Sequence, residues 1–288
     1  MADIQVLTEH IRQAALKEGF SACGIADLLP LTEADAVLDK WLQKGYHGTM
    51  SYMENNRDKR LNPSLLVEQS KSAIVVLLNY KPSRTMPKQL PQISKYAYGC
   101  DYHNVVKKML YQLLAHINAE ITLCKGVAFV DSAPVLEKAL AHRAGLGWIG
   151  KNSLLVNREF GSMTYIGTLL VDIPLVANKE VVSDGCGSCR LCMDSCPTSA
   201  IVEPRLINAN RCISYLNKTH KGDIADDLRP LIANRIFGCD ACIDACPYNK
   251  HSPSHSTPAL MPRKELFDTD LTKLTKSQFK KIVMRKKI

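Results

Sequence analysis

The sequence predicts an α+β protein in which a mixed α/β N-terminal domain precedes a small cysteine-rich module. Two observations predict this class. Helical and strand patterns alternate through residues 1–180, as they do in domains built around a sheet. Eight of the eleven cysteines then fall between residues 186 and 246, in a stretch too short to build a large core without bound metal. The predicted domains are therefore residues 1–180, residues 181–250 and a basic C-terminal extension over residues 251–288.

The elements of the first domain follow from hydrophobic periodicity. The apolar, β-branched run at residues 73–79 predicts a buried strand. Residues 102–121 predict the longest helix, because Val106, Leu110 and Leu113 recur at helical spacing. The other predicted helices span residues 6–18, 32–44 and 134–144, and the other predicted strands span residues 21–26, 127–130, 153–156 and 163–171.

The cysteines form two halves of a double iron–sulfur signature. The first half is Cys186-x2-Cys189-x2-Cys192-x3-Cys196-Pro197, and the second is Cys239-x2-Cys242-x3-Cys246-Pro247. In ferredoxins with two 4Fe–4S clusters, the cysteine before proline ligates the other cluster. The second half lacks its first cysteine, since Ile236 stands there, and Cys212 is the obvious replacement. The ferredoxin-like module is therefore predicted to bind one cluster through Cys186, Cys189, Cys192 and Cys246, and the other through Cys196, Cys212, Cys239 and Cys242.

Zinc and disulfides are the competing explanations for so many cysteines. Zinc also binds Cys-x2-Cys pairs, but a tetrahedral zinc site does not call for a third cysteine at the same spacing followed by Cys-Pro. Disulfides are not expected, because residues 1–10 do not form a signal peptide and no apolar run approaches a membrane span of roughly 18 residues. We therefore expect a cytoplasmic protein that makes no membrane contact.

The chain is basic, with a formal net charge of +9. Positive charge is most concentrated near the C-terminus, at Lys273, Lys276, Lys280, Lys281, Arg285, Lys286 and Lys287. Such a run is either a solvated helix face or a contact to a nucleic-acid backbone, and the second would make binding salt-dependent.

Residues 145–150 match the G-x-G-x-x-G pattern of dinucleotide-binding folds, and Lys151 extends the match towards a P-loop. Both motifs need a preceding strand and a following helix, whereas here a helix is predicted before the glycines and a strand after them. We interpret the segment as a glycine turn at the end of a helix that runs close to a ligand.

Candidates for chemistry outside the clusters are few. Asp131 ends a predicted buried strand, where it is either a turn or helix-capping carboxylate or a general acid whose pKa is raised by apolar neighbours. Cys100 lies in a Gly/Tyr loop close to His103 and is either a small core residue or a ligand contact.

A series of motifs in fixed order resembles one family over roughly residues 10–285. The motifs are Gly48-Thr-Met-Ser-Tyr52-Met, Arg60-Leu-Asn-Pro63, Tyr98-Gly-x-Asp-Tyr-His103, Val130-Asp-Ser-Ala-Pro134, Ala144-Gly-Leu-Gly-Trp-Ile-Gly-Lys-Asn152 and the double cysteine run. Together they are similar to epoxyqueuosine reductase, the cobalamin-dependent enzyme that completes queuosine synthesis in tRNA. The match is to a short form, without the C-terminal helical-repeat domain of longer members.

The resemblance implies that epoxyqueuosine at the anticodon wobble position is reduced to queuosine. Electrons from an external low-potential donor would pass through the two clusters to cobalamin, and Asp131 would be the general acid. The resemblance also implies that Arg60, Cys100, Ser214 and Lys221, together with Asp131, line the cobalamin. The partner is then tRNA, and the protein is expected to act as a monomer.

Two other functions compete with this one. A corrinoid oxidoreductase like the reductive dehalogenases is one, although those proteins typically carry a twin-arginine export signal that is absent here. The other is a ferredoxin-type electron-transfer subunit, which would need neither a corrin nor a buried acid.

Overall fold

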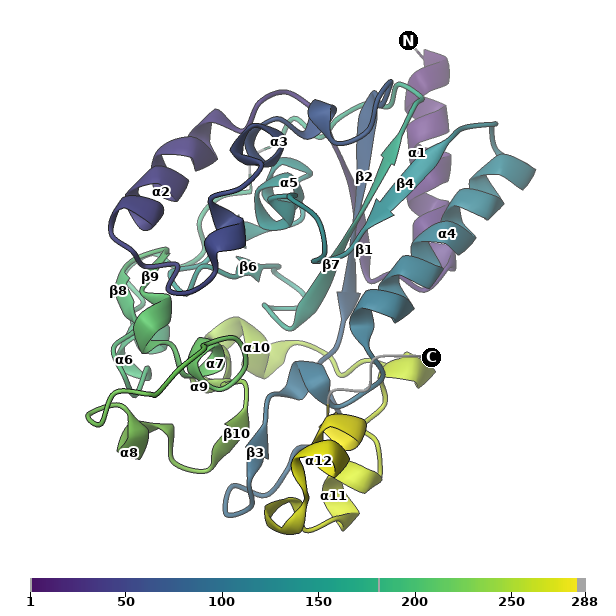
Figure 1. Cartoon of the computed structure of the whole chain (residues 1–288). Helices are drawn as coiled ribbons and strands as arrows, with labels where there is room; N and C mark the ends of the chain where they lie inside the picture. Colours follow the sequence, from purple (N-terminus) through teal and green to yellow (C-terminus); the bar gives the residue numbers. More distant parts are fainter. Residues whose placement is uncertain (1, 181, 284–288) are drawn as a thin grey trace.

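A four-stranded antiparallel sheet organises the first part of the chain (Figure 1). The computed structural model describes residues 2–180 and 182–283. The strands lie in the order β1 (Ala22–Ala26), β2 (Ser72–Asn79), β7 (Thr164–Val171) and β4 (Gly126–Phe129). The two central strands pair over eight residues, from Ser72 opposite Val171 to Asn79 opposite Thr164.

The central strand β2 is buried along its whole length because both faces of the sheet are covered. Ile74 and Val76 belong to one core, and Val75 and Leu77 belong to the other. This alternation follows from the two-residue period of a strand, and it explains why the sequence shows a continuous apolar run.

Helices cover both faces of the sheet (Figure 1). On one face α1 (Ala2–Lys17) packs beside α4 (Tyr102–Glu120), whose Leu110 and Leu113 are fully buried. The helix nearest the other face is α5 (Glu137–Arg143), and beyond it lie α2 (Thr32–Gln43) and α3 (Arg57–Leu61). The predicted α+β class is therefore confirmed.

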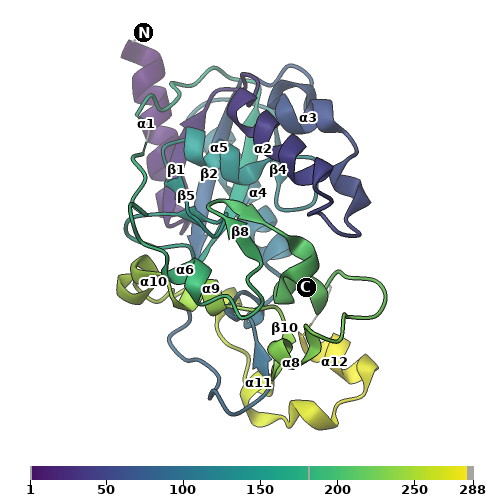
Figure 2. The same ribbon diagram turned by 90° about the vertical axis from the view of Figure 1, so that its left-hand side faces the viewer.

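The cysteine-rich segment lies at one end of the sheet in both views (Figures 1 and 2). It consists of short elements joined by loops: α6 (Leu191–Asp194), β8 (Ile201–Glu203), β9 (Leu206–Ile207), α7 (Ile213–Leu216), α8 (Arg229–Ile232), β10 (Arg235–Phe237), α9 (Ala241–Asp244) and α10 (Pro247–His251). Strand β10 pairs in parallel with β3 (Gln92–Ile93), so the first half of the chain supplies part of the support for this segment.

The C-terminal segment packs on the same side as β3 and β10. Its helices are α11 (Glu265–Asp268) and α12 (Lys276–Val283). Phe279 and Val283 of α12 belong to a hydrophobic cluster with Ile93 and Phe237, whereas Lys280 and Lys281 are exposed. The basic run thus places Lys280 and Lys281 on the exposed side of an anchored helix, whereas Lys273 precedes this helix in the short turn Leu271–Lys273. The other predicted members, Arg285, Lys286 and Lys287, lie outside the described residues.

Most predicted helices and strands occur within a few residues of their predicted bounds. The helix predicted at 134–144 begins only at Glu137, because residues 131–134 form a bend. The strand predicted at 153–156 is shortened to β6 (Leu155–Val156), since Ser153 has a left-handed backbone with φ 59°. In the part of the chain that the structure describes, no helix is long and apolar enough to cross a membrane.

Candidate functional site

The structure gathers the cysteines of the double signature into two sets of four. Burial, together with the charges of Cys186, Cys246 and Cys189, raises the pKa of Cys192, so these four sulfurs are close neighbours. They also line one cavity of about 280 Å³. The first set is therefore the one predicted from the spacing, with Cys246 crossing over from the second run.

The second set forms around Cys242. Burial raises its pKa, as do the nearby charges of Cys212, Cys239 and Cys196. The pKa of Cys212 is itself raised by burial and by Cys196. The structure thus brings Cys212 to the place left by Ile236, and Cys196 crosses over from the first run.

The geometry of the two sets fits clusters better than single ions. Within residues 2–180 and 182–283, no three His, Cys, Asp or Glu side chains converge closely enough to hold one metal ion. All eleven cysteines are free thiols, so none is used in a disulfide. In the first cavity the buried amide nitrogen Nδ2 of Asn152 has no hydrogen-bond partner in the described chain. A 4Fe–4S cluster suits such a cavity, because its sulfurs occupy corners between the thiolates and accept N–H hydrogen bonds.

The glycine-rich segment at 145–150 forms a wall of the first cavity. Helix α5 ends at Arg143, and Gly145 follows with φ +75°, which is the predicted glycine turn. Strand β5 (Trp148–Ile149) then pairs with β6, so no helix follows the glycines. The chain therefore lacks the strand–loop–helix context of a nucleotide site here, and Gly150 lines the first cavity instead.

Asp131 lies directly after β4, among polar side chains from two other parts of the chain. Tyr102 Oη donates a hydrogen bond to Asp131 Oδ2 at 2.5 Å, and His103 Nε2 lies 3.8 Å from the same oxygen. The Asp131 N–H donates to Glu137 Oε1 at 2.8 Å. Asp101 caps α4 by accepting from the His103 N–H at 3.0 Å, which places Tyr102 and His103 at the start of the helix.

The prediction of a raised Asp131 pKa is wrong for this structure. Desolvation by the surrounding protein does raise the pKa, but hydrogen bonds from His103 and Tyr102 outweigh it, so the Asp131 pKa lies below its ordinary value. The side chain is also 66% exposed rather than enclosed by apolar neighbours. The hydrogen bond to Asp131 in turn raises the pKa of His103. Within this pair the imidazole therefore holds a proton more readily than the carboxylate does.

Two further charged residues belong to this site, and the sequence analysis missed both. Burial raises the pKa of Glu137 to about 7, despite the hydrogen bond from Asp131. Lys218, from the cysteine-rich segment, donates to Tyr96 Oη at 2.9 Å and lies 4.6 Å from the centre of that ring. Burial lowers the pKa of Lys218 while the charge of Asp131 opposes that shift, so the lysine and the aspartate interact across the two parts of the chain.

The other predicted site residues are placed as follows. Arg60 in α3 is 7% exposed and donates to Tyr52 O at 2.8 Å and Asn55 O at 3.1 Å. Ser214 lies in α7, whereas Lys221 is exposed in the loop beyond it.

Cys100 has a different setting, because it packs against the main core and its N–H donates to Ala259 O at 2.9 Å. The preference of acidic residues for the first turn of a helix is the signal that could have revealed Glu137. No comparable signal marks Lys218.

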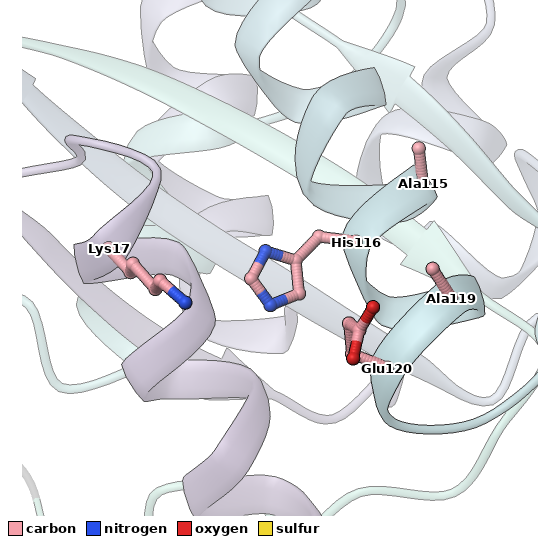
Figure 3. A pocket seen from close by; sticks show the side chains of 5 residues that line it. All are labelled: Lys17, Ala115, His116, Ala119 and Glu120. Atoms are coloured by element: carbon pink, nitrogen blue, oxygen red, sulfur yellow. The ribbon is translucent and has the colours of Figure 1, made fainter.

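A second hollow lies away from these groups, between α1 and α4 (Figure 3). It has a volume of about 550 Å³, and Lys17 faces His116 and Glu120 across it. His116 Nδ1 lies 2.9 Å from Glu18 Oε1. None of the predicted site residues lines this hollow.

The fold and the two cysteine sets define an iron–sulfur oxidoreductase in which a double-cluster segment packs against the core of an α/β sheet. Residues 185–249 match the model of the 4Fe–4S double cluster binding domain, and residues 60–132 match that of epoxyqueuosine reductase QueG, DUF1730. The epoxyqueuosine reductase of Cyclobacterium marinum is 42% identical over 99% of this chain and 93% of its own length.

Solved structures agree with these matches. A crystal structure of epoxyqueuosine reductase with an epoxyqueuosine-modified tRNA-Tyr stem loop has a TM-score of 0.85 and 30% identity, covering 97% of this chain and 76% of that one. A reductive dehalogenase whose structure suggests a mechanism for B12-dependent dehalogenation shares the fold. The two chains are 17% identical with a TM-score of 0.51, and the match covers 84% of this chain and 32% of that one. The chain belongs to the epoxyqueuosine reductase family, and its residues 185–249 form a 4Fe–4S double cluster binding domain.

The role of Cys212 as the eighth ligand can be tested by Cys212→Ala. We expect the iron content to fall below about eight per chain, because the second 4Fe–4S cluster loses one of its four thiolate ligands and holds its iron less tightly. Iron and sulfide analysis of anaerobically purified protein measures this. Cys124→Ala, which removes a half-buried cysteine outside both sets, should keep all the iron. Full iron content in Cys212→Ala would show that another residue completes the second set.

The raised pKa of Glu137 predicts a pH-dependent stability difference between the wild type and Glu137→Gln. Between the ordinary value of 4.5 and about 7, the folded wild type keeps a proton that the unfolded chain releases, so its stability falls as the pH rises. Glutamine does not titrate and can still accept from the Asp131 N–H. Glu137→Gln should therefore gain stability relative to the wild type between pH 5 and pH 8, measured as the difference in thermal midpoints. Parallel pH profiles would contradict the raised pKa.

Proposed function

We propose that this chain reduces epoxyqueuosine in tRNA to queuosine, converting the epoxide of the cyclopentane ring into an alkene with loss of the oxygen as water. The reaction consumes two electrons and two protons. The observation that carries the proposal is the juxtaposition of two four-cysteine sets with a proton-bearing cluster around Asp131, in a chain that matches the reductases over nearly its full length.

The residues around Asp131 supply the proton chemistry of this proposal. Asp131 is the general acid towards the epoxide oxygen. Because its carboxylate is ionised at rest, it first takes up a proton from His103, whose Nε2 lies 3.8 Å from Oδ2. Tyr102 holds the carboxylate by donating to Oδ2, and its ring stacks on Tyr165 at 4.4 Å between centroids. The Asp131 carboxylate is therefore oriented by the hydroxyl of a tyrosine whose ring is itself held by stacking.

The donor set beside Asp131 suits the amide and phosphate groups of a cobalamin. Arg60 is almost fully buried, and Lys218 presents an ammonium from the facing module. Arg60, Cys100, Asp131, Ser214 and Lys221 are the residues we propose to hold the group, with Lys218 added. Bound cobalamin supplies the reducing centre, and the clusters supply electrons singly.

The three segments divide this work. Residues 1–180 bind the cobalamin and carry the acid, residues 181–250 conduct electrons, and residues 251–288 contribute a basic face through α12. The protein takes its electrons from an external low-potential donor, acts on whole tRNA and functions as a monomer in the cytoplasm.

The acid assignment is tested by Asp131→Asn. An amide cannot donate the required proton, so turnover should fall by about 10²–10⁴-fold. Nucleoside mass analysis of tRNA after anaerobic incubation with cobalamin and a reductant measures the loss of one oxygen. Iron content should be unchanged, and Asp226→Asn at an exposed position is the matched control. Wild-type turnover in Asp131→Asn would rule out this acid.

The basic face of α12 is tested by the salt dependence of tRNA binding. Replacing Lys280 and Lys281 by alanine should weaken binding and reduce the slope of log affinity against log salt by about one for each lost phosphate contact. Binding is measured by titrating labelled tRNA at several salt concentrations. Alanine at the exposed lysines Lys17 and Lys125 should leave the slope unchanged. An unchanged slope in the α12 variant would remove this helix from the tRNA contact.

A further inference from the structure

One segment of the α/β domain, residues 148–152, supplies several polar groups to the first cluster cavity. Gly150, Lys151 and Asn152 line this cavity together with the four cysteines of the first set. The close approach is possible because Gly185, next to Cys186, lacks a side chain, since a Cβ there would lie 2.7 Å from the Trp148 ring. The motif that imitates a nucleotide-binding loop is thus part of the metal site.

Two groups of this segment already contact the loop that carries the ligands. Trp148 Nε1 donates to Cys186 Sγ at 3.4 Å. Lys151 Nζ donates to Gly187 O at 2.7 Å and to Cys189 O at 2.8 Å, which holds a positive charge beside the first set. Both groups favour negative charge on the sulfurs.

Asn152 is the third group, and its donor is unused. The residue is 3% exposed, and Leu154 N–H donates to its Oδ1 at 3.3 Å. That bond fixes the orientation of the amide and leaves Nδ2 as the free donor. Nδ2 is buried and has no hydrogen-bond partner in the described part of the chain. An unpaired buried donor loses its hydrogen bonds to water without gaining others, so a buried N–H at the wall of a cavity indicates an acceptor inside it.

We propose that Asn152 Nδ2–H donates a hydrogen bond to a sulfur of the first 4Fe–4S cluster and, with Trp148 and Lys151, raises the reduction potential of that cluster. Reduction adds one electron and so one negative charge to the cluster. A donor that faces the sulfurs stabilises the reduced form more than the oxidised form, which raises the potential. The inference rests on the double cluster of the proposed function, but it does not depend on the substrate.

The two clusters of each molecule provide an internal reference. The second set lies outside this segment and has its own donor, the Ala200 N–H, 3.2 Å from Cys196 Sγ. A change at residue 152 should therefore move one midpoint potential and leave the other in place. This selectivity distinguishes a direct hydrogen bond from a general loosening of the module.

The experiment compares the wild type with Asn152→Ala, which removes the donor and the Oδ1 acceptor, and Asn152→Asp, which keeps the acceptor for Leu154. An anaerobic redox titration followed by EPR gives both midpoints. We expect each variant to lower one midpoint by an amount equal to about a tenfold change in the reduction equilibrium, or about 59 mV for one electron. Trp148→Phe should lower the same midpoint. Asn234→Asp, where Nδ2 already donates to Lys88 O and Leu90 O, should move neither.

Unchanged midpoints in both Asn152 variants would overturn the inference, and so would a shift in the aspartate variant alone, which reports added charge rather than a lost donor. If a variant loses its first cluster, the hydrogen bond is tested in the wild-type protein instead. Pulsed EPR of reduced protein labelled with 15N at asparagine side chains should then show a nitrogen coupling, and its absence would also overturn the inference. Wild-type protein with far fewer than about eight irons would instead contradict the double cluster of the proposed function.

Discussion

The crossed arrangement of the cysteines is the constraint on which the rest of the structure depends. Cys196 belongs to the first run but to the second set, and Cys246 belongs to the second run but to the first set. Neither set can therefore be completed by one run alone. Helices α6 and α9, which follow the first cysteines of each run, are forced to lie against each other, and Ser195 Oγ donates across them to Ala241 O at 3.2 Å. Short helices of four residues have little stability of their own, so shared ligands must hold them.

The module is tied to the α/β domain at points that also border the proposed active site. Gly48 has φ +60°, and a Cβ there would come within 2.5 Å of Tyr215 Oη, so only glycine lets the two parts meet. The Tyr215 hydroxyl in turn accepts from the Thr49 N–H at 2.6 Å. The same strip of chain continues to Tyr52, whose pKa burial raises with help from the charge of Asp131. Motifs separated by more than 150 residues thus converge on one boundary.

The sequence was sufficient for those features that depend on local period or on spacing. The continuous apolar run of β2, the helical period of α4 and the spacing of the two cysteine runs could all be read along the chain, whereas Cys212 was assigned as the cysteine that remains between the runs. The short elements of the module could not, since four residues carry no usable period. The environment of Asp131 was also beyond prediction. Its pKa depends on Tyr102 and His103, which lie about 30 residues earlier and meet it only because α4 crosses the sheet beside β4.

Two carboxyl groups with opposite pKa shifts lie side by side at this boundary. Hydrogen bonds from His103 and Tyr102 keep Asp131 ionised, whereas burial raises the pKa of Glu137 to about 7. Each carboxylate also disfavours the ionised form of the other, because like charges repel at short range. Near neutral pH Glu137 is therefore partly protonated, and the raised pKa of His103 favours a second proton on the imidazole. A reduction that consumes two protons needs both within reach, and a pair of carboxyl groups whose environments separate their pKa values meets that need without burying a permanently neutral aspartic acid.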